Sequence, residues 1–257
     1  MWGALGYAIA VLSVGWLLDQ IGLSLLFVVH AGILLLTLLI AVNLPIKQGR
    51  GIEFKWKEAM VVFKSAPYVS FLLFNFLLQL TVSAHNSFYS LYLKQFGIGL
   101  TMVGFALLLK SILEIPFFAT SNWFLKRFSF RFLLALVAVV YAARWLILGV
   151  STSPFLLIAS QVLLSLSFSV HSFTAVVFVD QVMPDKYKST GQTLYWATSF
   201  GLSGVAGNVL AAWFLNHFSI GAMYQWITGI VLIAALIIWV SIRNLESNVN
   251  NKQSVRF

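Results

Sequence analysis

Long apolar segments recur along almost the whole chain, and short polar stretches separate them. The apolar segments cover residues 2–18, 23–44, 68–93, 101–123, 132–150, 154–179, 190–214 and 222–242. Because a helix rises about 1.5 Å per residue, a bilayer core about 30 Å thick needs roughly 20 apolar residues for each crossing. The pattern therefore predicts an all-α membrane protein with eight transmembrane helices.

The composition supports this prediction. Of the 257 residues, 60% are hydrophobic and only 9% are charged, and the mean hydropathy is +0.93. A water-soluble domain is excluded, since the chain has too few polar side chains to cover a water-facing surface. The absence of cysteine excludes disulfides, thiolate metal sites and cysteine nucleophiles. No group of His, Asp and Glu has metal-ligand spacing, so we expect no metal and no cofactor.

The net charge of +9 is distributed in a way that indicates topology. In an alternating arrangement of eight spans, Lys94 alone falls in a loop on one side. The opposite side carries Lys47, Arg50, Lys55, Lys57, Lys64, Lys126, Arg127, Arg131, Lys186, Lys188, Arg243, Lys252 and Arg256. The positive-inside rule then predicts a multi-pass protein of the plasma membrane with both termini in the cytoplasm. The positive charge is explained by topology, and we expect no binding of nucleic acid.

One extended polar segment interrupts the series of spans. Residues 45–67 separate two predicted helices in residues 1–44 from six in residues 68–243, and residues 244–257 form a tail. Within this segment, residues 51–65 alternate apolar and basic positions. This pattern predicts a short amphipathic helix at the cytoplasmic surface of the bilayer.

A few ionisable residues lie deep in the predicted spans. Lys110 and Glu114 occupy the fourth span, Arg144 the fifth, and Asp180 the end of the sixth. A charged group in hydrocarbon costs about 2.5 to 3.5 kcal/mol, so such residues usually face a protein interior or a water-filled path. Lys110 and Glu114 share a helix face and form either a local ion pair or a site where Glu114 takes up and releases a coupling proton. We expect Asp180 to be a solvated charge.

Polar residues recur every three or four positions on three further spans, so each set shares one helix face. The stripes are Gln79, Ser83, Asn86 and Ser90, then Gln161, Ser165, Ser169 and Ser172, and finally Gln192, Trp196, Ser199 and Ser203. Each stripe alone is equally well explained as packing between membrane helices. Three stripes beside two ionisable residues on a fourth span favour one shared polar cavity for a small solute.

Aromatic and histidine residues add weaker candidates. Tyr89, Tyr92, Tyr141, Trp145 and Trp196 suit stacking on a sugar or an aromatic acid, although aromatic residues also anchor and fill membrane helices. Arg144 suits a carboxylate and weakly favours an organic anion. His85 and His171 are possible proton carriers, but a buried histidine in a core is the commoner case.

The string Gly201-Leu202-Ser203-Gly204 matches the nucleophile signature of rhomboid intramembrane proteases. A serine nucleophile needs a base, and the only later histidine is His217, which falls in a loop. We therefore do not expect an enzyme. The glycines at 201, 204 and 207 instead predict a close contact between helices.

Several short strings, in this order, resemble the major facilitator superfamily, in the branch of phenylpropionate permease and lactose permease. They are Trp2-Gly3-Ala4-Leu5-Gly6-Tyr7, Gly15-Trp16-Leu17-Leu18-Asp19, Tyr92-Leu93, Met102-Val103-Gly104, Glu114-Ile115-Pro116, Leu125-Lys126-Arg127-Phe128, Arg144-Trp145 and Ser153-Pro154. The resemblance implies that the spans correspond to family helices five to twelve, so that the fold lacks its first four helices and has a complete C-terminal six-helix bundle.

The resemblance also implies a secondary active transporter, a proton-coupled symporter of a sugar, nucleoside or aromatic acid. As a fragment with one cavity wall, the chain is expected to be inactive alone. In lactose permease a His and a Glu follow the ninth-helix Arg, but the equivalent positions after Arg144 hold Leu164 and Ser167. Glu114 and Arg144 remain the predicted coupling pair, with Lys110 and His171 as further candidates. The alternative is a membrane protein that binds a partner or acts as a sensor without transport.

Overall fold

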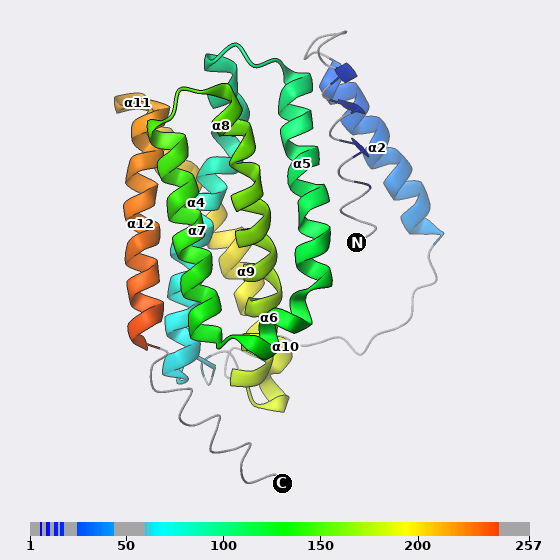
Figure 1. Ribbon diagram of the computed structural model, residues 1–257. Helices are drawn as coiled ribbons and strands as arrows, with labels where there is room; N and C mark the ends of the chain where they lie inside the picture. Colours follow the sequence, from blue (N-terminus) through cyan, green and yellow to red (C-terminus); the bar gives the residue numbers. More distant parts are fainter. Residues whose placement is uncertain are drawn as a thin grey trace.

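A computed structural model describes residues 25–43 and 62–241, together with Gly6, Ile9, Ala10, Ser13, Val14, Trp16, Leu17 and Met60. The elements are α2 (Leu25–Val42), α4 (Ala66–Gln95), α5 (Leu100–Ala119), α6 (Ser121–Arg127), α7 (Phe130–Val150), α8 (Pro154–Ala159), α9 (Gln161–Val182), the 3-10 turn η1 (Asp185–Tyr187), α10 (Lys188–Trp196), the π-helical segment η2 (Ala197–Leu202), α11 (Ser203–His217) and α12 (Ile220–Ser241). Every regular element in this part of the chain is helical, as the apolar pattern predicted (Figure 1).

Six helical segments of the described chain are long and apolar enough to cross a bilayer. They are Ala66–Gln95, Leu100–Ala119, Phe130–Val150, Pro154–Val182, Asp185–His217 and Ile220–Ser241, and they correspond to the third to eighth predicted spans. The second predicted span contains α2, whose apolar stretch Phe27–Val42 is shorter. The first span is described at a few positions only. Most of the predicted amphipathic helix at 51–65, and all of the tail at 244–257, lie outside the described residues.

The six spans pack into one bundle. Helix α7 lies between α9 and α12, α4 packs against α11 and α12, and α5 packs against α9. The circle closes where α10 packs against α9 (Figure 1). The interior is filled mainly by apolar and aromatic side chains, among them Phe71, Tyr141, Trp145 and Tyr224, each at most 1% exposed.

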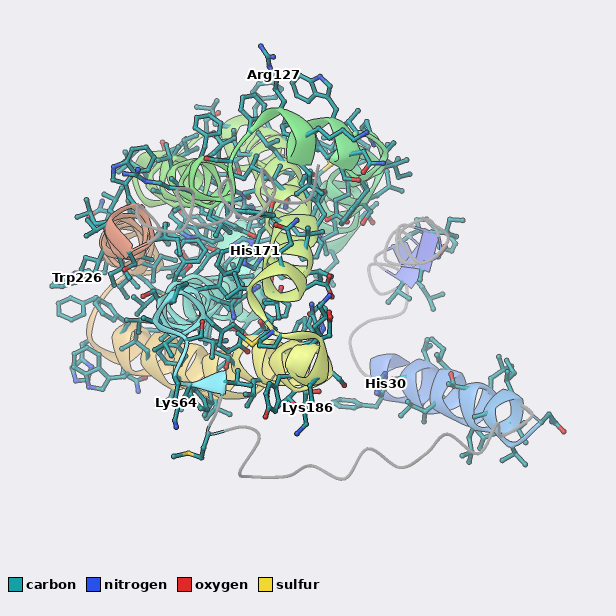
Figure 2. All side chains as sticks on the ribbon, turned by 90° about the horizontal axis from the view of Figure 1, so that it is seen from below. His30, Lys64, Arg127, His171, Lys186 and Trp226 are labelled. Carbon is teal, nitrogen blue, oxygen red and sulfur yellow. The ribbon has the colours of Figure 1, made fainter. Side chains whose placement is uncertain are left out.

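Basic residues gather at one end of this bundle. Lys64 precedes α4, Arg127 ends α6 and Lys186 lies in η1, and Figures 1 and 2 show these residues around the rim of the same end of the bundle. Lys94 lies in the last turn of α4, at the opposite end. The fold therefore keeps the one-sided distribution of positive charge from which the topology was predicted.

Two helices carry local irregularities that shape the bundle. Pro116 lies inside α5 and lacks the N–H that would complete the helical ladder, and the chain turns at Thr120 into α6 soon afterwards. Between α10 and α11, residues 197–202 form a π-helical turn. Such turns are rare, and they occur often at functional sites.

The glycine contact predicted for the seventh span is confirmed at one position and wrong at two. A Cβ added to Gly207 would lie 2.3 Å from the carbonyl oxygen of Leu80, so only glycine allows α11 to approach α4 this closely. A Cβ added to Gly201 or Gly204 would meet nothing within 4 Å. Six positions at about 100° each place Gly201 about 120° from Gly207 around a regular helix, so the two do not share one face.

Candidate functional site

Arg144 lies at the centre of the bundle and is completely buried. Its guanidinium donates from Nε to the Ser160 carbonyl oxygen at 3.1 Å and from Nη2 to Gln161 Oε1 at 3.3 Å. Its Nη1 lies 3.2 Å from Nε2 of His85. The ion pairs seen among the described residues all involve lysine, so no described carboxylate pairs with Arg144. A buried cation is thus held by neutral acceptors.

Aromatic rings complete the surroundings of this cation. The guanidinium carbon lies 5.0 Å from the ring centre of Trp145 and 5.6 Å from that of Tyr89. Both distances fall within the range in which a cation is attracted to an aromatic ring. Trp145 is fixed in turn, because its Nε1 donates to Thr81 Oγ1 at 3.1 Å. Tyr89 donates its hydroxyl to the Leu157 carbonyl oxygen at 3.3 Å.

His85 is a stronger functional candidate in the structure than the sequence alone indicated. Its Nδ1 lies 2.9 Å from the Tyr224 hydroxyl, so this single ring connects α4, α7 and α12. A guanidinium has donors only, so His85 Nε2 must accept and Nδ1–H must donate to Tyr224. His85 is therefore neutral in this arrangement. The sequence does contain one indication of this role: His85 and Arg144 both lie well inside their predicted spans.

Lys110 and Glu114 form the predicted ion pair on α5. The Glu114 side chain is 8% exposed and that of Lys110 is 19% exposed. The Lys110 ammonium also lies 4.5 Å from the ring centre of Phe168. Glu114 is not paired with Arg144, so the structure places the two members of the predicted coupling pair in separate clusters. Proton exchange at Glu114 stays a prediction.

His171 lies inside the bundle, as Figure 2 shows, but apart from Arg144. Its ring centre is 6.4 Å from those of Phe74 and Tyr195, and its Nε2 has no hydrogen-bond partner among the residues that the structure describes. Nearby on α4, Asn75 donates to Ser199 Oγ at 2.9 Å and leaves its own Oδ1 without a partner. These residues form a second buried polar cluster, next to the π-helical turn.

The structure divides the predicted stripes between two environments. On α4, Gln79 and Ser83 are half-buried and Asn86 is exposed. On α10, Trp196 is 44% exposed, and Gln192 donates to the Val176 carbonyl oxygen. These residues are therefore partly or fully exposed on the described six-helix bundle.

The stripe on α9 faces the interior instead. Gln161 is buried and binds Arg144, and Ser165 donates to the carbonyl oxygens of Lys110 and Gln161, which ties α9 to α5. Ser199, from the α10–α11 stripe, is buried too and donates to the Tyr195 carbonyl oxygen. The assignment of these residues to a substrate cavity stays a prediction.

A hollow of about 600 Å³ lies at the start of α5. Its lining is Ser13, Val14, Trp16, Leu17 and Thr101. Thr101 and Glu114 are separated by about 20 Å along the helix at 1.5 Å per residue, so this largely apolar hollow is distinct from both charged clusters.

Asp180 and Ser203 have the ordinary roles expected of them. Asp180 is exposed and pairs with Lys188 at 3.2 Å, as predicted for a solvated charge at the end of a span. Ser203 Oγ is buried and lies 3.1 Å from the Phe76 carbonyl oxygen and 2.7 Å from that of Thr198. Its contacts are structural.

Comparison with known proteins supports the family resemblance. The model of the MFS_1 like family matches residues 1–242. The chain belongs to this family. Its members belong to the major facilitator superfamily of transporters, so the protein is a multi-pass membrane protein and not an enzyme.

Individual relatives of this MFS_1 like protein agree. Maltose permease of Geobacillus stearothermophilus is 29% identical over 93% of this chain and 61% of its own length. Xanthosine permease of Escherichia coli (strain K12) is 25% identical over 66% of this chain and 44% of its own length. The uncharacterized transporter YwbF of Bacillus subtilis (strain 168) is 22% identical over 96% of this chain and 62% of its own length.

A crystal structure of the nucleoside transporter NupG has the same fold. It matches with a TM-score of 0.77 and 18% identity, over 94% of this chain and 66% of that one. The chain spans about three fifths of the length of maltose permease and YwbF.

Proposed function

We propose that this chain is part of a secondary active transporter for a small organic solute, driven by protons across the plasma membrane. Family membership and the permeases among its relatives support transport. The named substrates of those relatives, maltose and xanthosine, favour a sugar or a nucleoside over an aromatic acid. In this proposal residues 68–243 form the C-terminal half, and residues 1–44 are the last two helices of the N-terminal half.

The observation that carries the proposal is the set of charges kept inside the bundle. Charged residues within membrane spans are expensive and mark transport pathways or proton relays. Among the carboxylates of the described residues, Asp180 and Asp185 lie at an end of the bundle, whereas Glu114 lies deep within α5. We assign the coupling proton to Glu114, because its protonation would remove the charge that pairs with Lys110.

The solute site is proposed on the exposed polar face of α4 and α10. Transporters of this type bind solutes near the midplane, between two halves that move against each other. Gln79, Asn86 and Gln192 supply amide groups on this face, and Trp196 supplies an aromatic ring for stacking.

The test is uptake of labelled maltose and xanthosine by cells that express the gene with its native upstream sequence. We expect accumulation that a protonophore abolishes and that Glu114→Gln reduces to the level of cells without the gene. Lys94 lies in the last turn of α4, at the end of the bundle opposite Lys64 and Arg127. Lys94→Gln also removes one charge, so it serves as the control and should transport normally.

Two results would contradict the proposal at different levels. Uptake that persists in the Glu114→Gln variant would remove Glu114 as the proton site but leave transport standing. Absence of uptake across sugars, nucleosides and aromatic acids, with the protein folded in the membrane, would favour a partner-binding or sensor role instead.

A further inference from the structure

Side chains, rather than adjacent backbones, connect α4 to α7. The main neighbours of α4 are α11 and α12, and those of α7 are α9 and α12. Three hydrogen bonds cross between the two helices, from Trp145 to Thr81, from Tyr92 to the Leu148 carbonyl oxygen, and between Arg144 and His85. The last of these is the only one of the three that involves two ionisable side chains.

The hydrogen-bond roles at His85 leave one ring position for an added proton. Nδ1 already carries a hydrogen, which it donates to Tyr224. Nε2 holds the lone pair that accepts from Arg144 Nη1. A proton taken up by His85 must therefore bind at Nε2, where it faces the guanidinium at a nitrogen–nitrogen distance of 3.2 Å.

The charges around His85 do not compensate a second cation. From α7 it faces Arg144, from α12 the neutral Tyr224, and from its own helix the neutral Tyr89. On α5, the ammonium of Lys110 is paired with Glu114, so these two charges cancel. No carboxylate of the described residues contacts His85 or Arg144. Protonation therefore replaces a hydrogen bond with repulsion between two buried cations, which must separate.

We propose that His85 is a proton-binding site whose occupation breaks the bond to Arg144 and so loosens the contact of α4 with α7, which the bonds from Trp145 and Tyr92 still maintain. The proton comes from solvent and binds Nε2, while Nδ1–H remains bonded to Tyr224. Arg144 keeps its bonds to the Ser160 carbonyl oxygen and to Gln161. This site is distinct from Glu114, and the inference rests on these contacts and not on transport.

The first test is thermal unfolding of the full chain in lipid nanodiscs between pH 7.5 and 5.5. The folded state holds His85 neutral, whereas an unfolded histidine binds a proton below about pH 6.5, so stability is lost as the pH falls. We expect the unfolding midpoint to decrease on acidification. In His85→Gln the decrease should be smaller, because the glutamine Oε1 can accept from Arg144 and does not titrate.

Two further variants keep this test decisive. His171→Gln removes the other buried histidine and should retain the contribution of His85 to the pH dependence. Arg144→Gln removes the opposing cation and should also reduce the pH dependence of the unfolding midpoint. This variant provides the test if His85→Gln does not fold. An unchanged decrease of the midpoint in both His85→Gln and Arg144→Gln would overturn the proposal.

The second test asks whether the helices separate. The chain has no cysteine, so Ala138→Cys provides a single thiol on α7, buried two turns before Trp145 on the same helix face. We expect the ratio of maleimide labelling at pH 5.5 to that at pH 7.5 to be several-fold greater with His85 present than in the His85→Gln background. Because the thiol ionises in the same way in both backgrounds, comparing the two ratios removes the effect of its ionisation. Equal ratios would show that protonation does not open this interface.

Discussion

At the scale of the residue, Arg144 keeps its charge inside the bundle because neutral acceptors and aromatic faces surround it. Its hydrogen bonds reach His85 on α4, the break between α8 and α9 at Ser160, and Gln161 at the start of α9. A planar guanidinium can donate hydrogen bonds to three partners that lie in different directions. The ammonium of lysine is a compact point charge and cannot reproduce this geometry. Arg144 therefore holds several helices in register.

This arrangement predicts that replacing Arg144 destabilises the protein even when positive charge is kept. Arg144→Lys should lower the free energy of unfolding by about 2 to 4 kcal/mol, because each buried polar group left without a partner costs about 1 to 3 kcal/mol. Arg127→Lys, at the exposed end of α6, is the matched control and should be neutral. Thermal unfolding in detergent or nanodiscs measures both, and equal stability of the two variants would contradict the role assigned to Arg144.

At the scale of the element, the helices were predictable and their contacts were not. Apolar length is a local property, so the third to eighth spans could be assigned from the sequence, and Lys110 and Glu114 could be paired because they are four residues apart on one helix. The partners of Arg144 could not be assigned in this way. His85 lies 59 residues earlier in the chain, and it comes close because α4 and α7 both pack against α12.

Gly207 brings α11 close to α4, so substitution of this glycine should change the stability of the protein. Gly207→Ala should destabilise the protein by about 1 to 3 kcal/mol, the usual cost of overpacking, because the new methyl group collides with the Leu80 backbone. Gly204→Ala has open space and should be neutral or stabilising by up to about 1 kcal/mol, since alanine favours helix over glycine. Thermal unfolding of both variants measures these effects. If Gly207→Ala were as stable as the unchanged protein, the close contact of α11 with α4 would be wrong.

At the scale of the whole molecule, Lys64, Arg127 and Lys186 lie at one end of the six-helix bundle (Figures 1 and 2), and Asn86 on α4 and Trp196 on α10 are exposed. In the proposed function, the other half of the transporter covers these exposed residues. The chain spans about three fifths of the length of maltose permease and YwbF, which is in line with the eight spans predicted from its apolar segments. The glycine pattern alone did not reveal the π-helical turn that changes the phase of the seventh span.

The orientation of the bundle can be measured directly, because the chain has no cysteine. A membrane-impermeant maleimide should label Gln95→Cys in intact cells, since Gln95 is the last residue of α4, at the end of the bundle opposite Lys64 and Arg127. Asn122→Cys, in α6 near the basic end, should react only after the cells are permeabilised. The reverse pattern would place the positive end of the bundle outside the cell and contradict the predicted topology.

In the proposed mechanism, the movement of a solute is coupled to that of a proton through Glu114. The most direct measurement is the pH of a weakly buffered suspension of de-energised cells that express the gene with its native upstream sequence, recorded as maltose or xanthosine is added. We expect a transient alkalinisation of the medium, as protons enter with the solute, and no such change with Glu114→Gln. Solute entry without alkalinisation, or the same alkalinisation with Glu114→Gln, would contradict it.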